Sequence, residues 1–210
     1  MNNLLRFSNE VFCVSDYETE SLNLLQDNRP WNLGFVLFDN RKILDRQSFY
    51  IWWEDLNISE GAARATRFNY DEYKRKAKPQ QEIWEIWKKY LYNKDLIHIQ
   101  HNGIMFDSYI TQIWRAQNNL GRDYSFLNSY IDTNSLAKAW KLGLKSIKRK
   151  DWLQTWYKYG NYNEKGLKTN LTTLGKELNI NFDYNNLHQA ENDCLLNRLI
   201  FQQLIYKIDI

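Results

Sequence analysis

The stretch VFCVSDYET, residues 11–19, decides the fold that we expect for this chain. Its first half is apolar, and its second half holds two carboxylates, Asp16 and Glu18, two positions apart. Successive side chains of a β-strand point to opposite faces, so residues two apart point the same way. We therefore predict a buried strand that ends with Asp16 and Glu18 projecting together. Two carboxylates on such a rigid base suit a hard divalent cation.

The composition is that of a globular protein with one domain. The chain has 210 residues, of which 43% are hydrophobic, and its formal net charge is +3. This length allows a sizeable buried core. The mild positive charge disfavours a basic partner and is compatible with a polyanion. The sequence shows no internal repeat and no low-complexity linker, so we expect a single domain over residues 1–210.

The two cysteines and the lack of long apolar runs indicate where in the cell we expect the protein. Cys13 and Cys194 lie in apolar surroundings, and neither belongs to a Cys-x-x-Cys pair, which is typical of a reducing compartment. No run approaches the ~20 apolar residues of a membrane span. We therefore expect a cytoplasmic protein with no membrane partner.

Alternating and helical periodicities predict the order of the elements. After the first strand, the predicted strands cover residues 31–38, 43–53, 96–100 and 130–131. Helical patterns fall within residues 58–78, after Pro79, and over 106–120, 136–142, 171–178 and 191–206. An antiparallel meander followed by alternating strands and helices predicts an α/β fold, with a mixed central sheet flanked by helices.

Two of these helices carry specific predictions of a buried face. In residues 106–120 we expect Tyr109 to be buried with Ile110, Ile113 and Trp114, and Gly121 to end the helix. In residues 191–206 we expect Leu195, Leu199 and Ile200, followed by Gln203-Leu204, to form the buried stripe.

Further acidic residues and one histidine follow later strands or precede helices. Asp107 lies just after the strand at 96–100, where sites in α/β sheets gather. A role as a helix cap explains this residue equally well. His188 and Asp193 can converge if a helix begins directly after His188 and Asp193 lies in its first turns. Asp132 lies at a strand end among helix-capping residue types, which favours a capping role. A position behind the metal ligands is the alternative.

Residues 141–168 differ in character from the rest of the chain. They contain eight basic residues against two acidic ones, a net charge of +6, with Trp152, Trp156, Tyr157, Tyr159 and Tyr162 interleaved. Cations for phosphates beside rings for bases are typical of a surface that binds single-stranded nucleic acid. A solvated helix with one apolar face followed by a loop is the alternative. We interpret the segment as a basic, aromatic-rich insertion.

Taken together, the motifs resemble those of a known superfamily. Asp16-x-Glu18-Thr19, then His101-Asn102-Gly103-x-x-Phe106-Asp107, then His188-x-Ala190-x-x-Asp193 are similar to the three motifs of DEDD exonucleases. The histidine is that of the DEDDh (DnaQ-like) branch, which includes the proofreading epsilon subunit of bacterial replicative polymerases and Trex-type 3′ exonucleases. The resemblance spans roughly residues 11 to 201.

The resemblance implies a ribonuclease-H-like fold and two divalent metal ions, Mg²⁺ or Mn²⁺. By position, Asp16, Glu18, Asp107 and Asp193 would hold the metals, and His188 would be the general base. Thr19, Leu22, Asn102 and Gly103 would contact the terminal nucleotide. The chain departs from many relatives at Glu20-Ser21, and we expect Glu20 to add charge beside the metal acids.

The implied activity is 3′-to-5′ hydrolysis of single-stranded DNA with release of nucleoside 5′-monophosphates. An RNA or oligoribonucleotide exonuclease is the first alternative, because sugar choice depends on contacts to the 2′-hydroxyl that the sequence does not locate. A nucleic-acid-binding or polymerase-interaction module without catalysis is the second, and a transferase or endonuclease on the same fold is a third. The expected partner is single-stranded nucleic acid, and a polymerase is a possible further one.

Overall fold

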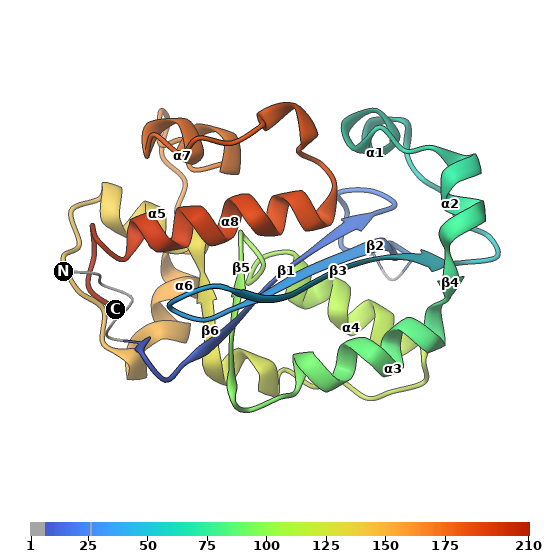
Figure 1. Cartoon of the computed structure of the whole chain (residues 1–210), viewed down its shortest axis with the longest axis horizontal. Helices are drawn as coiled ribbons and strands as arrows, with labels where there is room; N and C mark the ends of the chain where they lie inside the picture. Colours follow the sequence, from blue (N-terminus) through green and yellow to red (C-terminus); the bar gives the residue numbers. More distant parts are fainter. Residues whose placement is uncertain (1–6, 26) are drawn as a thin grey trace.

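A six-stranded sheet in the order β4-β3-β2-β1-β5-β6 forms the centre of the structure (Figure 1). The computed structural model describes residues 7–25 and 27–210. The strands are β1 (Val11–Thr19), β2 (Pro30–Phe38), β3 (Ile43–Trp52), β4 (Lys78–Pro79), β5 (Leu96–Gln100) and β6 (Tyr130–Asp132). β1, β2 and β3 form an antiparallel meander, whereas β1–β5, β5–β6 and β3–β4 pair in parallel. The predicted mixed sheet is thereby confirmed.

Eight α-helices connect or follow these strands in the described part of the chain. They are α1 (Glu60–Thr66), α2 (Tyr70–Lys76), α3 (Gln80–Leu91), α4 (Asp107–Gln117), α5 (Thr133–Lys141), α6 (Trp152–Gly160), α7 (Leu171–Glu177) and α8 (Ala190–Leu204). Short 3₁₀ turns η2 (Ser125–Ser129), η3 (Arg149–Asp151) and η4 (Tyr184–Asn186) lie between them. None of the described helices is long and apolar enough to cross a membrane.

The side chains of β1 alternate between the two faces of the sheet, and different helices cover these two faces. Phe12 packs on Phe201 of α8, with ring centroids 5.2 Å apart. Tyr17 faces the other way, where its hydroxyl accepts a hydrogen bond from Nε1 of Trp87 in α3 over 2.7 Å. Helix α8 therefore covers one face of the sheet and α3 lies on the opposite face, as Figure 1 shows. Asp16 and Glu18 share the alternation of Phe12 and so face α8.

Apart from the short strand β4, which was not predicted, the predicted elements agree with the structure except at two helices. In α4, Ile110, Ile113 and Trp114 are buried as predicted, but Tyr109 lies outside that stripe and is 37% exposed. The helix ends at Gln117, before Gly121, and Asn119 takes the left-handed backbone conformation after it.

In α8 the buried side is broader than the predicted stripe. Leu195 and Leu199 are only half-buried, whereas Ile200 is fully buried as expected. The prediction failed because α8 packs against the sheet on one side and against α5 and α7 on others. Polar residues consequently occur on its buried side, which comprises Asp193, Cys194, Leu196, Asn197, Ile200, Phe201 and Leu204 together with Ala190.

Candidate active site

The two carboxylates of β1 project toward α8 at the end of the strand. In the pairing with β2, Asp16 lies opposite Gly34 and Glu18 opposite Asn32. Both acidic side chains are half-buried. The predicted projection of Asp16 and Glu18 to one face is therefore found in the structure.

Asp193 reaches the same place because α8 begins directly against β2. A Cβ atom on Gly34 would overlap the backbone of Ala190 and Glu191, so only glycine allows this approach. The Ala190 N–H donates to Oδ1 of Asn32 over 3.3 Å, which fixes the start of the helix. Our sequence reasoning missed Asn32 and Gly34. A glycine inside a predicted strand was the available signal of a close backbone approach.

Carboxylate oxygens of Asp16, Glu18 and Asp193 lie within 4.8 Å of one another. This is the set of donors that hard divalent cations prefer. Asp107, the first residue of α4, is 4% exposed, and its Oδ1 has no hydrogen-bond partner. A buried carboxylate oxygen without a partner is costly unless another group binds it. The arrangement therefore fits a cation held by Asp16, Glu18 and Asp193 with Asp107 beside them.

Burial raises the pKa of all four carboxyl groups, and repulsion from the other acids of the cluster adds to this effect at Asp16 and Glu18. Burial, followed by repulsion from the other three, raises the pKa of Asp16 well above its ordinary value. Burial, then repulsion from Asp193 and Asp107, raises the pKa of Glu18 to about 8. Burial raises the pKa of Asp107 to about 7 and that of Asp193 to about 6, the latter against the opposing effect of His188. Bound divalent cations would remove this penalty by favouring the ionised form of each group.

His188 stands immediately before α8, as the spacing predicts. Its backbone takes a left-handed conformation with φ of 67°, and its N–H donates to Oδ1 of Asp193 over 3.2 Å. The side chain is exposed and lines a small cavity with Gln189 and Asn192. The His188 imidazole is therefore open to solvent, and its role as general base stays a prediction.

The turn between β5 and α4 holds Asn102 and Gly103. Asn102 has a φ of 64°, and its Oδ1 accepts a hydrogen bond from Asn134 over 2.9 Å. A Cβ atom on Gly103 would overlap the hydroxyl of Tyr130 and the side chain of Gln100. The contacts of both residues thus support the turn that leads to Asp107, and their role in nucleotide binding stays a prediction.

Asp132 supports the same turn from β6. Its Oδ1 accepts from the N–H of Ser135 over 2.8 Å and so caps α5, as predicted. Its Oδ2 accepts from the N–H of Ile104 over 3.0 Å. One buried carboxylate therefore connects the start of α5 to the segment before Asp107.

Two of the residues expected at the terminal nucleotide lie at the end of β1. The Thr19 hydroxyl donates to the carbonyl of Ser21 over 2.6 Å and is buried. Leu22 is 89% exposed. Neither observation tests the predicted roles of Thr19 and Leu22, which stay predictions.

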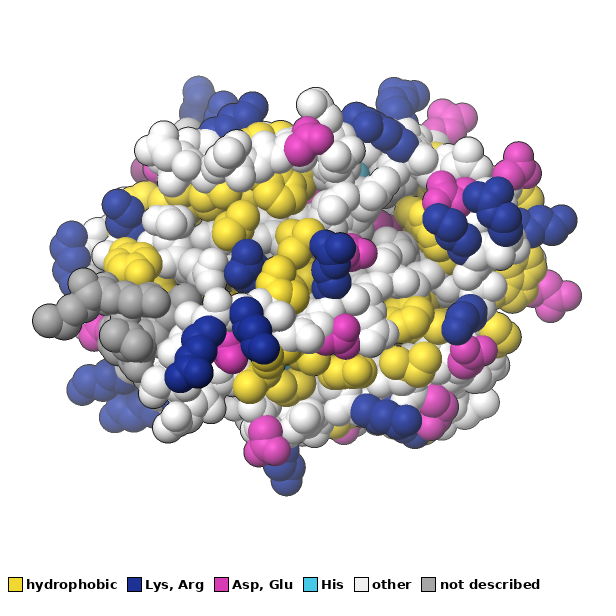
Figure 2. All heavy atoms as spheres, in the orientation of Figure 1, with side chains coloured by type: hydrophobic (Ala, Val, Ile, Leu, Met, Phe, Trp, Pro, Cys, Tyr) yellow, Lys and Arg dark blue, Asp and Glu magenta, His cyan; other side chains and the backbone are white. Residues whose placement is uncertain are grey.

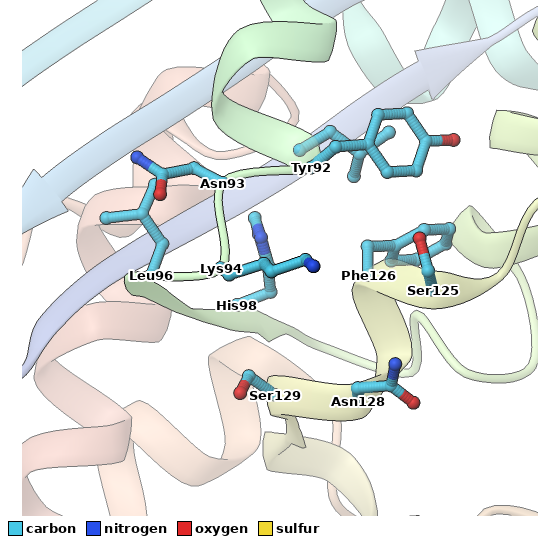
Figure 3. Close-up of a pocket in the computed structure, with 10 residues that line it drawn as sticks. Tyr92, Asn93, Lys94, Leu96, His98, Ser125, Phe126, Asn128 and Ser129 are labelled. Atoms are coloured by element: carbon cyan, nitrogen blue, oxygen red, sulfur yellow. The ribbon is translucent and has the colours of Figure 1, made fainter.

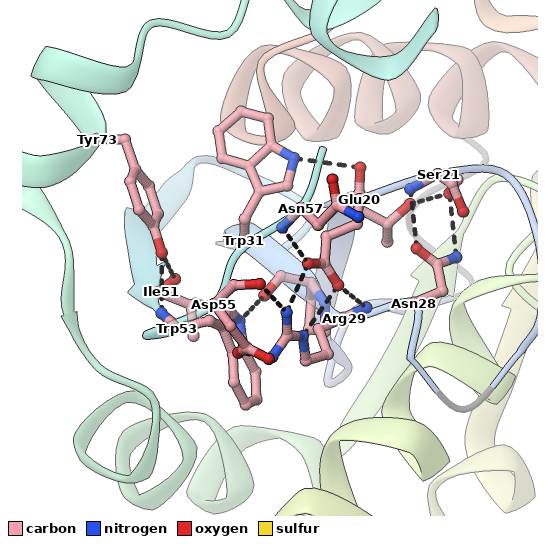
Figure 4. A network of polar contacts seen from close by, with 12 residues as sticks. Glu20, Ser21, Asn28, Arg29, Trp31, Ile51, Trp53, Asp55, Asn57 and Tyr73 are labelled. Carbon is pink, nitrogen blue, oxygen red and sulfur yellow. Dashed lines mark hydrogen bonds and ion pairs between the residues drawn. The ribbon is translucent and has the colours of Figure 1, made fainter. Parts of the chain in front are cut away.

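Glu20 does not add charge to the acidic cluster, contrary to our expectation. The register of β1 shifts between Glu18 and Thr19, which breaks the alternation that would have aligned Glu20 with the other acids. Its carboxylate instead accepts from the Arg29 guanidinium over 2.7 and 3.0 Å and from the Asn57 N–H over 2.7 Å (Figure 4). Arg29 neutralises this charge and ties the loop after β1 to the segment after β3.

The segment 141–168 is only in part the predicted surface. Trp152 and Trp156 are buried, and Nε1 of Trp156 donates to the carbonyl of Tyr130 over 2.7 Å. These two rings anchor α6 against β6 and α5, so their expected role in stacking on bases is wrong. Tyr157 and Tyr162 are 38% and 40% exposed. The status of the segment as an insertion stays a prediction.

The architecture around these residues is shared with solved structures of exonuclease I from E. coli. The zinc-bound form in complex with single-stranded DNA superposes with a TM-score of 0.74 at 17% sequence identity. A complex with a dT13 oligonucleotide gives a TM-score of 0.73 at 18% identity. The fold is ribonuclease-H-like. In both comparisons the match covers 94% of this chain and 41% of the other.

The chain thus spans about two fifths of the length of these structures. No protein-family model matches the sequence, and no curated protein matches it. The similarity therefore establishes the fold. The chemistry of the site depends on its own side chains.

Proposed function

We propose that the protein is a metal-dependent 3′-to-5′ exonuclease of the DEDDh type that releases nucleoside 5′-monophosphates from single-stranded DNA. The observation that carries this proposal is the convergence of Asp16, Glu18 and Asp193 within 4.8 Å beside the unpartnered carboxylate of Asp107. The fold shared with exonuclease I, whose structures contain single-stranded oligonucleotides, supports the same conclusion.

The four carboxylates would hold two divalent ions, Mg²⁺ or Mn²⁺. When bound, such ions lower the pKa of a water molecule and offset charge on the attacking and leaving oxygens of a phosphodiester. The protein contributes a rigid strand for Asp16 and Glu18, and helix starts for Asp107 and Asp193. These fixed positions keep the acids close together despite their mutual repulsion.

His188 is the proposed general base for the attacking water. Its side chain is exposed, so it can accept a proton in the substrate complex and release it to solvent. Its backbone hydrogen bond to Asp193 holds it next to the acidic cluster.

An exposed group of tyrosines near α4 supports a single-stranded substrate. Tyr109, two residues after Asp107, is 37% exposed, as is Tyr124, and Tyr157 is 38% exposed. Burial, then the proximity of Tyr109 and Tyr124, raises the pKa of Tyr157, so the three side chains lie near one another. Aromatic side chains of this kind stack on unpaired bases irrespective of sequence.

Basic residues do not define the path of the strand on the face shown in Figure 2. There the described lysine and arginine side chains are scattered, with acidic side chains between them. On this face, stacking and bound metal ions support the proposal more than a basic stripe does. Association with a polymerase stays a prediction from the sequence resemblance.

The test uses 5′-labelled oligonucleotides of one sequence as single-stranded DNA, blunt duplex DNA and single-stranded RNA, each with Mg²⁺. We expect stepwise shortening from the 3′ end, fastest for single-stranded DNA, and none with Asp193→Asn. Faster RNA degradation would assign the protein to the oligoribonucleotide alternative. No shortening of any substrate by folded protein would overturn the proposal in favour of a binding module.

A further inference from the structure

A second cavity, of about 350 Å³, opens between the end of α3, the start of β5 and the 3₁₀ turn η2 (Figure 3). Its buried wall is formed by Leu91, Leu96, His98 and Phe126. Its exposed rim comprises Asn93, Lys94, Ser125 and Asn128. Apolar walls with a few convergent polar groups, in this range of volume, are typical of sites for small molecules.

His98 is an unusual residue to find in this wall. It is 3% exposed, and neither ring nitrogen has a hydrogen-bond partner in the described structure. The Leu91 carbonyl is near enough to raise the pKa of the ring slightly, but it forms no hydrogen bond of normal geometry with it. Burial lowers the pKa of His98 to about 4, so the ring is neutral. A neutral imidazole has one donor and one acceptor, and leaving both unused is costly.

This cavity is distant from the acidic cluster. Leu96 pairs with Val11 at the beginning of β1, whereas Asp16 and Glu18 lie at its other end. Five to seven residues of extended strand separate the two levels, which is about 17–23 Å. The cavity and the proposed nuclease site can therefore be occupied independently.

We propose that this cavity binds a small planar heteroaromatic anion that carries an N–H donor. The ring of the ligand would lie against Phe126 and Leu91, and its N–H would reach the free ring nitrogen of His98. Its anionic group would reach Lys94, whose ammonium group has no ion-pair partner among the described residues. Nucleotides and heteroaromatic carboxylates with a ring N–H both carry this chemistry. The proposal does not depend on nuclease activity.

Three probes distinguish the two classes of ligand and test whether the N–H donor is needed. They are adenosine 5′-monophosphate, indole-3-acetate and benzoate, which lacks an N–H. Binding is followed by ¹⁵N signals of the histidine rings in EDTA, so that no metal site contributes. The chain has three histidines, which makes assignment practical. We expect a saturable shift of the His98 signals by one of the first two probes, with His188 unaffected. The probe that binds more tightly shows whether the cavity prefers a nucleotide or a carboxylate as its ligand.

Two variants sharpen the result. His98→Phe keeps an aromatic ring and removes both nitrogens. Binding to this variant is followed by the backbone amide signals of Lys94 and Ser125, and we expect it to weaken about 10-fold or more. Lys94→Ala changes only an exposed side chain and should weaken binding about 3- to 10-fold. If His98→Phe does not fold, Ser125→Trp, which obstructs the rim, provides the second variant and should abolish the shift.

The proposal is overturned if no probe shifts the His98 signals at millimolar concentration, because an internal water would then be the sole partner of the ring. Equal binding by the parent protein, Lys94→Ala and Ser125→Trp would overturn it as well. Equal binding of benzoate and indole-3-acetate would contradict the role assigned to His98.

Discussion

The backbone N–H of His188 donates to Oδ1 of Asp193 over 3.2 Å, and His188 holds a left-handed conformation to do so. This bond joins the loop before α8 to the first turns of the helix. The proposed base and one proposed metal ligand therefore keep a fixed relation, although the His188 side chain itself is exposed. Loss of the imidazole should affect the cleavage rate, whereas disfavouring the left-handed backbone conformation should affect stability, so the two effects can be measured separately.

His188→Asn tests the imidazole alone, because asparagine tolerates the left-handed conformation. We expect cleavage to slow by roughly 10²- to 10⁴-fold, the usual contribution of a general base, with little change in thermal stability. His188→Ala should lose similar activity and about 1 kcal/mol of stability as well. Single-turnover rates and unfolding midpoints measure the two effects. A rate within twofold of the parent would remove His188 from the mechanism.

Gly34→Ala tests the approach of α8 to β2. The added Cβ would overlap backbone atoms of Ala190 and Glu191, so the start of α8 must move. We expect a loss of about 1–3 kcal/mol in the free energy of unfolding, together with a loss of activity through displacement of Asp193.

The matched control is Gly61→Ala in α1, where a Cβ meets nothing within 4 Å. This change should stabilise the protein by about 0.5–1 kcal/mol and leave cleavage unchanged. A Gly34→Ala protein with parental stability and activity would contradict the packing described here.

The acidic cluster predicts an unusual pH dependence of the metal-free protein. The pKa values of Glu18, Asp107 and Asp193 rise to about 8, 7 and 6 on folding. The folded protein therefore binds more protons than the unfolded chain from about pH 4 to about pH 8, and stability falls as pH rises through this window.

Urea midpoints in EDTA at about pH 5.5 and pH 8 measure this fall, which we expect to be on the order of 5 kcal/mol. Saturating Mg²⁺ should reduce it, because bound cations favour the ionised carboxylates. A metal-free protein that gains stability over the same range would show that the carboxylates are not mutually strained.

The contact between Glu20 and Arg29 predicts a large effect outside the acidic cluster. Arg29→Met would leave the buried Glu20 carboxylate without its cation, at a cost of about 3–5 kcal/mol. Asp55→Asn removes the other, exposed partner of Arg29 and should cost much less, because solvent screens this ion pair. Chemical denaturation of the two variants compares them. Similar small losses in both would contradict the structural role of the Glu20–Arg29 pair.

The sequence allowed prediction of the strands and of the acids at their ends, because strand alternation and helix spacing are local properties. Asp16 and Glu18 face one way by the pleat alone, and α8 begins after His188 as the spacing requires. The α/β fold could likewise be predicted, because the order of elements restricts how a mixed sheet can form.

Features that depend on distant partners could not be predicted. Glu20 differs from Glu18 only through a register shift and an arginine nine residues away. Trp152 and Trp156 lie in a segment whose composition is typical of a stacking surface, but both are buried because α6 packs against β6. The nearness of α8 to Gly34 likewise involves residues more than 150 positions apart.

The measurement that most directly tests the central claim is a count of Mn²⁺ ions bound per chain, made by electron paramagnetic resonance on the folded protein. We expect two ions for the parent protein and two for Glu191→Gln, a neighbouring acid on α8 that pairs with Arg46 over 3.4 Å. Asp16→Asn should lose at least one ion. Absence of saturable Mn²⁺ binding, or equal binding by all three proteins, would contradict the assignment of these carboxylates as a metal centre.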